Sequence, residues 1–158
     1  MIKASSRIEM KELIYEDTAR YDFWLKLILG SVLAILFIIG VVLLFIDILG
    51  ASVMFGVTLF DALLFKAILP RRFQIFQDRI KIILGGPFTI SISFSNIREV
   101  RAVSANEVFV YWGVRLATST QSVVEIVRKS GLSLVIAPAN REMFLEQFNQ
   151  ANSASQGQ

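Results

Sequence analysis

Residues 27–46 read LILGSVLAILFIIGVVLLFI and contain no charged side chain. At about 1.5 Å per residue, a helix of this length measures roughly 30 Å, which matches the hydrocarbon core of a bilayer. Phe23, Trp24 and Lys26 precede the stretch and are typical of an interfacial anchor, because aromatic rings and lysine ends favour the headgroup region. The sequence therefore predicts a transmembrane helix over about 23–47.

A second apolar stretch covers residues 48–69 and is interrupted only by Asp61 and Lys66, before Pro70 closes it. With Gly50 as the helix breaker, the connection is so short that the two segments must be antiparallel neighbours. The prediction is a transmembrane hairpin over 23–69, with helices at about 23–47 and 51–69. The alternative, a buried amphipathic segment, is disfavoured because this segment is apolar nearly all round.

The basic residues flanking these segments predict their orientation. Residues 1–26 contain five Lys and Arg, residues 66–81 contain five, and the connection contains none. Since Lys and Arg concentrate in cytoplasmic loops, both termini are expected in the cytoplasm, on a multi-pass integral membrane protein. Residues 1–22 are expected to form a cytoplasmic arm, extended or helical, held by the following domain.

The composition argues against an enzyme. The 158 residues are 54% hydrophobic and 18% charged, and they include neither His nor Cys. A chain without these residues has no catalytic triad, no cysteine nucleophile and no zinc–thiolate site. No cofactor and no metal site is expected. The net charge of only +3 comes from scattered basic residues, which does not support nucleic-acid binding.

After Arg72 the hydrophobic period changes from helical to alternating. Residues 88–95 alternate phenylalanine or isoleucine with serine or threonine, residues 80–84 alternate similarly, and Gly85-Gly86-Pro87 marks a turn between them. Further strands are expected at 73–77, 97–103, 114–119, 123–128 and 132–137. These make about seven short strands, all expected to be antiparallel.

The C-terminal part changes back to a helical pattern. Pro138 ends the last strand, Asn140 is a candidate helix cap, and Phe144 and Phe148 share one helical face. Residues 152–158 are polar and are expected to be disordered. The predicted class is α+β, with a transmembrane hairpin, a seven-stranded domain at 70–151 and a closing helix.

Seven antiparallel strands followed by one helix is the order of a pleckstrin-homology (PH) barrel. The segments FQIFQDRIKIILGG, SNIREVRAV and VVEIVRKSGLSLVIAPANREMFLEQF carry this likeness. With the preceding hairpin, the chain resembles the bacterial PH-like family whose members place two transmembrane helices directly before the domain. The resemblance implies a non-enzymatic protein of the cell envelope or of membrane-bound assemblies.

Three aromatic residues, Phe109, Tyr111 and Trp112, crowd the segment between two predicted strands. If this segment is itself a strand, its alternation places at least one large aromatic pair on the outer face, where it would contact a partner or the membrane. The alternative is that Trp112 is buried under the C-terminal helix.

A basic set, Arg71, Arg72, Arg79 and Lys81, is a candidate for contact with anionic headgroups. The alternative is that Arg71 and Arg72 only set the topology and that the others are solvated. The first strand–strand loop, residues 77–79, is too short and too weakly basic for the phosphoinositide cradle of eukaryotic PH domains.

Asp61 is expected to lie inside the membrane, where a charged carboxylate has a high free-energy cost. Such a residue is a candidate functional site. An ion site, a contact with a partner helix, and a structural role near the interface are all open.

The leading functional hypothesis is a membrane-anchored PH-like interaction module that scaffolds, assembles or stabilises other membrane proteins at the inner leaflet. The alternative is a small ion- or solute-handling protein that uses Asp61. Assembly with a second copy of the chain stays open.

Overall fold

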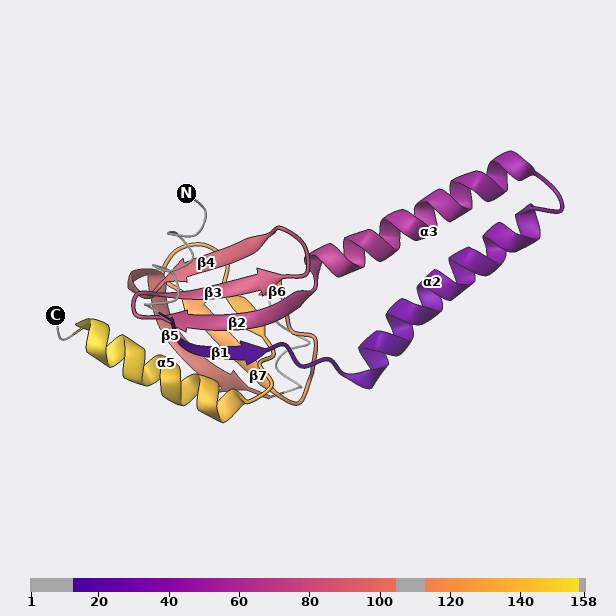
Figure 1. Ribbon diagram of the computed structural model, residues 1–158. Coiled ribbons are helices and arrows are strands. Elements are labelled where there is room, and N and C mark those ends of the chain that lie inside the picture. The colour runs from indigo at the N-terminus through magenta and orange to yellow at the C-terminus, as the bar shows by residue number, and fades with distance from the viewer. Residues whose placement is uncertain (1–12, 105–112, 157–158) are drawn as a thin grey trace.

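The computed structural model describes residues 13–104 and 113–156 and has an α+β fold. Two long apolar helices project from a domain of β-sheet and one further helix (Figure 1). In chain order the elements are β1 (Leu13–Thr18), α2 (Phe23–Leu43), α3 (Ile48–Ile68), β2 (Pro70–Phe76), β3 (Arg79–Leu84), β4 (Thr89–Ser93), η1 (Phe94–Asn96), β5 (Ile97–Val103), β6 (Val114–Arg115), β7 (Val123–Arg128), β8 (Leu134–Ile136) and α5 (Arg141–Gln156). The strands and α5 together are called the β-domain below.

Helices α2 and α3 form the expected hairpin. Each has 21 residues, and their mean hydropathies of 2.7 and 2.0 make both long and apolar enough to cross a membrane. The turn lies at residues 44–47, earlier than expected, because the Asp47 carboxylate caps α3. It accepts hydrogen bonds from the main-chain N–H groups of Leu49 and Gly50 at 3.0 and 3.1 Å. Gly50 therefore lies in the first turn of α3 and does not break the helix.

The two helices pack most closely near their tip. Gly40 on α2 and Ala51 on α3 are buried, and a Cβ at Gly40 would lie 3.0 Å from the ring of Phe55. The Phe37 and Phe55 rings also meet, with centroids 5.5 Å apart. The absence of a side chain at Gly40 thus leaves room for the Phe55 ring to pack against α2.

The hairpin is inserted between two paired strands of one sheet. Strand β1 precedes the helices, β2 follows them, and the two strands are antiparallel neighbours with Tyr15 opposite Ile75 and Asp17 opposite Phe73. In the described part of the predicted N-terminal arm, residues 13–18 are therefore a strand of the β-domain. The helical hairpin replaces the short turn that usually joins such strands.

The prediction of seven antiparallel strands after the hairpin is confirmed in part: within the described ranges β2 to β8 are seven strands, but β1 adds an eighth and one of the pairings is parallel. The described residues form two four-stranded sheets, in the orders β1-β2-β3-β4 and β5-β7-β8-β6, and no pairing among them joins one sheet to the other. Strand β6 has only two residues and runs parallel to β8. It ends early because the chain after it turns away to bond with residues 20–22, as described below.

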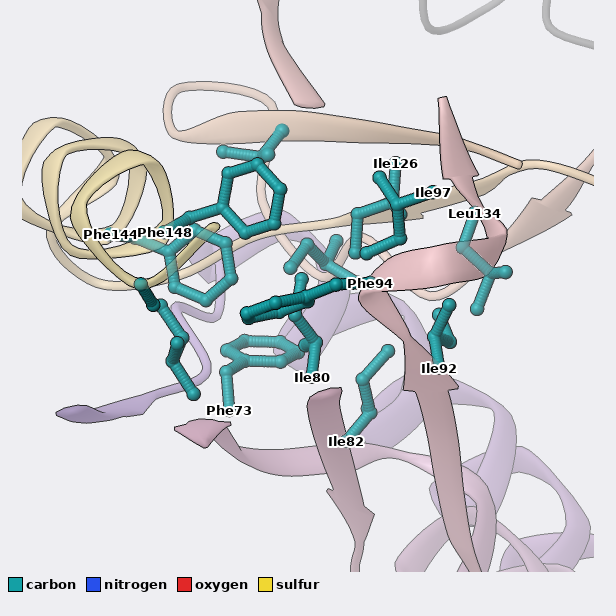
Figure 2. Close-up of a cluster of buried hydrophobic side chains, with 14 residues drawn as sticks. Phe73, Ile80, Ile82, Ile92, Phe94, Ile97, Ile126, Leu134, Phe144 and Phe148 are labelled. Carbon is teal, nitrogen blue, oxygen red and sulfur yellow. The ribbon is translucent and has the colours of Figure 1, made fainter. Parts of the chain in front are cut away.

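Helix α5 packs its aromatic residues between the sheets (Figure 2). Phe144 meets Phe73 of β2 edge to face, with ring centroids 6.4 Å apart, and Phe148 meets Phe94 at 5.3 Å. The isoleucines of both sheets complete this core: Ile75, Ile80, Ile82, Ile92, Ile97, Ile126 and Ile136. The predicted helical face of the C-terminal segment is confirmed.

The ends of α5 differ in how well the sequence predicted them. The Asn140 side chain accepts a hydrogen bond from the Met143 N–H at 3.1 Å, as expected for a helix cap. The helix then continues to Gln156, so the prediction of a disordered segment from residue 152 is wrong for residues 152–156. Buried Ala151 keeps the helix on the core, and the alanine and glutamine that follow are compatible with helix.

Candidate functional site

The hairpin joins the β-domain through two neighbouring segments, residues 19–22 before α2 and residues 69–71 after α3. The main-chain N–H of Ala19 donates to the Arg71 carbonyl, and that of Asp22 donates to the Thr118 carbonyl, both at 2.9 Å. The Arg20 N–H donates to the Ala137 carbonyl, also at 2.9 Å. These bonds attach the start of α2 to both sheets. We call this region the junction.

Asp22 is the most heavily bonded side chain of the junction. Its carboxylate accepts the Ser119 hydroxyl at 2.6 Å, the Thr120 N–H at 2.7 Å and the Thr120 hydroxyl at 3.0 Å. Burial acts to raise the pKa of Asp22, but these hydrogen bonds and the nearby charge of Arg20 outweigh it and lower the pKa. An ionised carboxylate therefore holds the loop after β6 against the start of α2.

The β3–β4 turn attaches the other end of the hairpin. The Gly85 N–H donates to the Leu69 carbonyl at 2.8 Å, and the Gly86 N–H donates to the Ala67 carbonyl at 3.1 Å. These carbonyls lie at the C-terminal end of α3, where a helix has no internal donors left. The Gly85-Gly86 pair, expected only to form a turn, thus also caps the second helix.

Tyr21 connects the two segments of the junction. Its hydroxyl donates a hydrogen bond to the Pro70 carbonyl. Burial raises the pKa of Tyr21, while the neighbouring charge of Arg71 acts in the opposite direction. The phenol is therefore a neutral donor at neutral pH, and it ties the segment before α2 to the segment after α3.

A cavity of about 310 Å³ opens at the junction between the two helices. Its lining residues include Lys26 of α2, Lys66 of α3, Arg71 of β2 and Tyr21. The remaining lining residues are all leucines: Leu25, Leu29 and Leu69. None of the lining residues is acidic, so the cavity combines three cations with an apolar wall.

The predicted interfacial anchor lies at this end of the hairpin. Phe23 and Trp24 are 71% and 70% exposed, and their rings meet edge to face with centroids 6.3 Å apart. Phe88, two residues after the Gly86 that bonds to α3, is also exposed, at 58%. The alternation over residues 88–95 predicted that Phe88 belongs to a strand. The Gly-Gly-Pro directly before it was the signal for a position at the tip of a turn.

The structure separates the four basic residues proposed for headgroup contact. Arg71 lies at the junction, and Arg72 pairs with Glu16 of β1 at 3.0 Å. Arg79 begins β3, at the end of that strand remote from the hairpin, and lies 2.9 Å from the Asp78 carboxylate. Lys81 lies 6.0 Å above the Phe76 ring, toward the same remote end. Only Arg71 joins the cavity.

The aromatic segment with Phe109, Tyr111 and Trp112 lies outside the described residues. The structure therefore does not address either interpretation of that segment.

Asp61 is half-buried on α3, between the tip of the hairpin and the junction. The facing part of α2, residues 27–43, carries no charged side chain. The Asp61 carboxylate makes no hydrogen bond or ion pair with any residue that the structure describes. No group of acidic residues suited to a metal ion occurs in residues 13–104 or 113–156. Asp61 thus has no described ionisable partner across the hairpin.

Comparison of the chain with protein-family models, with curated proteins and with solved structures found no match.

Proposed function

We propose that the protein is a membrane-anchored interaction module. Helices α2 and α3 cross the bilayer, and the β-domain lies on the cytoplasmic leaflet, where it scaffolds or stabilises other membrane proteins. The five-to-zero-to-five distribution of Lys and Arg around the two helices supports this orientation. The order of strands and the closing helix support a PH-like β-domain, although among residues 13–104 and 113–156 no pairing joins its two sheets.

One observation carries the proposal: the hairpin is inserted between β1 and β2, and both of its ends are bonded to the β-domain. A domain attached to one helix by a single linker samples many orientations. Here the bonds of Ala19, Asp22, Gly85 and Gly86 fix the helices relative to the sheets. The β-domain therefore presents a constant face to the bilayer and to neighbouring proteins, as an assembly factor requires.

The alternative, ion or solute handling through Asp61, receives no support from the described helices. A relay needs a second ionisable group at the same depth, and residues 27–43 of the facing helix contain none. A non-enzymatic role agrees with a chain that has no His or Cys.

Reporter fusions test the membrane part of the proposal. A reporter that functions only in the cytoplasm is fused after Gln158 or inserted between Phe45 and Ile46, in the α2–α3 turn. The C-terminal fusion is expected to be active and the turn insertion inactive. Activity of the turn insertion would show that the hairpin does not cross the membrane.

Purification of the full chain in a mild detergent tests the scaffold part. We expect other membrane proteins to co-purify with the chain in stoichiometric amount and to be crosslinked to it in cells. Trp112→Ala should abolish this co-purification without a large change in the melting temperature of the chain itself. A tryptophan side chain buried in a protein interface contributes about 2 kcal/mol or more to the binding free energy. A chain that is monomeric and alone, in cells and in detergent, would overturn the scaffold proposal.

A further inference from the structure

The junction cavity collects positive charge from three separate elements. Lys26 lies three residues inside α2, Lys66 lies two residues before the end of α3, and Arg71 is the second residue of β2. None of these side chains makes an ion pair with a described residue. Three basic residues and no acidic one among the lining residues favour an anion over a cation as the ligand.

The apolar side of the cavity determines what kind of anion fits. Leu25, Leu29 and Leu69 form its wall, and the wall continues into the exposed apolar surfaces of α2 and α3. A free inorganic anion would leave this wall in contact with water, whereas an amphiphile would cover it. The ligand that matches both sides has an anionic head and apolar chains.

The position of the cavity along the hairpin supports the same conclusion. It lies at the end of α2 and α3 that adjoins the β-domain, opposite the turn at the tip (Figure 1). If the hairpin crosses the bilayer as proposed above, this is the level of the cytoplasmic phosphates. Basic pockets between membrane helices at this level are suited to anionic phospholipids.

We propose that the cavity binds the phosphate of an anionic phospholipid, with an acyl chain lying along the leucines. The Arg71 guanidinium is suited to two parallel hydrogen bonds to phosphate oxygens, and the ammonium groups of Lys26 and Lys66 add positive charge from either side. The bond from the Tyr21 hydroxyl to the Pro70 carbonyl, and that from the Ala19 N–H to the Arg71 carbonyl, hold the cavity in shape without a ligand. This proposal rests on the proposed membrane insertion and adds a specific lipid to it.

The test uses the full chain in detergent micelles doped with phosphatidylglycerol or with phosphatidylcholine, and it measures thermal unfolding and lipid retained in native mass spectrometry. Phosphatidylglycerol is expected to raise the melting temperature in a saturable manner and to be retained, whereas phosphatidylcholine is not. Lys66→Gln together with Arg71→Gln should weaken the apparent affinity for phosphatidylglycerol about tenfold.

A matched control separates the cavity from general surface charge. Arg98→Gln with Lys129→Gln also removes one arginine and one lysine, but both residues lie at the remote ends of β5 and β7. This variant should keep the affinity of the unaltered chain. Leu25→Phe keeps every charge and fills part of the cavity, so it should reduce retention of the lipid. The melting temperatures in phosphatidylcholine show whether each variant is folded.

The outcomes are distinguishable. Equal retention of both lipids, or equal loss in the cavity and control variants, would overturn the lipid site while leaving the membrane anchor intact. If millimolar inorganic phosphate or glycerol phosphate displaces bound phosphatidylglycerol as strongly as added lipid does, the cavity is a simple anion site. That result would also overturn the proposal. An active reporter in the α2–α3 turn would remove the proposed membrane insertion itself.

Discussion

Gly85 lies so close to Lys66 that a Cβ atom built on Gly85 would come within 1.7 Å of the Lys66 carbonyl oxygen. The contact is backbone against backbone, so no side-chain rotation relieves it. The β3–β4 turn therefore reaches the end of α3 only because residue 85 has no side chain. This contact, with the two hydrogen bonds beside it, fixes the second helix to the first sheet.

Substitution of Gly85 by Ala is expected to separate the turn from α3. The added methyl group forces a backbone shift, which we expect to lower the free energy of unfolding by about 2 kcal/mol or more. Thermal unfolding in detergent measures the loss. Gly56→Ala is the control, because a Cβ on Gly56 meets nothing within 4 Å. A Gly85→Ala chain as stable as the Gly56→Ala chain would contradict the close contact.

Asp22 is expected to make the stability of the junction depend on pH. Its pKa in the folded chain lies below the ordinary value of 3.8, because the donors at Ser119 and Thr120 favour the ionised form. The stabilisation is therefore complete above pH 3.8 and is lost as the pH falls through the lower folded-state pKa. Asp22→Asn should cost about 1–2 kcal/mol at pH 7, because one of its two side-chain acceptors becomes a donor.

The measurement for Asp22 is the melting temperature between pH 3 and pH 7. The difference between the original chain and Asp22→Asn should be largest at neutral pH and should shrink in acid. A constant difference across this range would show that the carboxylate charge contributes nothing. Asp78→Asn is the control, since Asp78 is exposed and far from the junction.

Replacement of Gly40 by Leu is expected to open the hairpin at its tip. Even a Cβ at this position lies 3.0 Å from the Phe55 ring, so a leucine must displace that ring, and we expect the helices to separate as a result. Spin labels on Ile35→Cys and Phe60→Cys measure the separation, and the absence of native cysteine removes background labelling. The label distance should increase in Gly40→Leu and stay unchanged in Gly30→Leu, where a Cβ meets nothing within 4 Å.

Asp61 is expected to be dispensable for ion flux. Asp61→Asn should insert and fold normally, and proton flux into vesicles loaded with a pH-sensitive dye should equal that of the original chain. If a partner helix contacts Asp61, Asp61→Leu should weaken the association of the two helices by roughly 0.6 kcal/mol, which is seen as reduced co-purification of the partner. Asp61→Asn retains a hydrogen-bonding group and should be tolerated. A proton current that disappears in Asp61→Asn would favour the transport alternative over the scaffold.

Local patterns in the sequence predicted those parts of the fold that depend on neighbouring residues. The uncharged run at 27–46 predicted the first helix, and the alternation at 80–84 and 88–95 predicted β3 and β4. The pair Phe144 and Phe148 predicted the buried face of α5. The first signal is the length of an apolar run, and the other two are periodic, because one face of a strand or helix meets the core along its whole length. The hairpin turn was placed too late, because the capping role of Asp47 was missed.

Other features depended on contacts between distant residues. Strand β1 is recognised only by its pairing with β2, which lies beyond the whole hairpin in sequence. The parallel pairing of β6 with β8 has no local signal either. The cavity brings together Lys26, Lys66 and Arg71, which in sequence read as separate topology and anchor residues.

Local patterns of hydrophobic residues are sufficient to predict two helices of membrane-spanning length, a β-rich segment and a closing helix, because each pattern involves residues that are close in sequence. They do not predict that the hairpin interrupts a sheet, that Gly85 contacts α3 or that Lys26, Lys66 and Arg71 line one cavity. These facts follow from which distant segments pack together, and packing depends on shape and hydrogen-bond pairing across the whole fold.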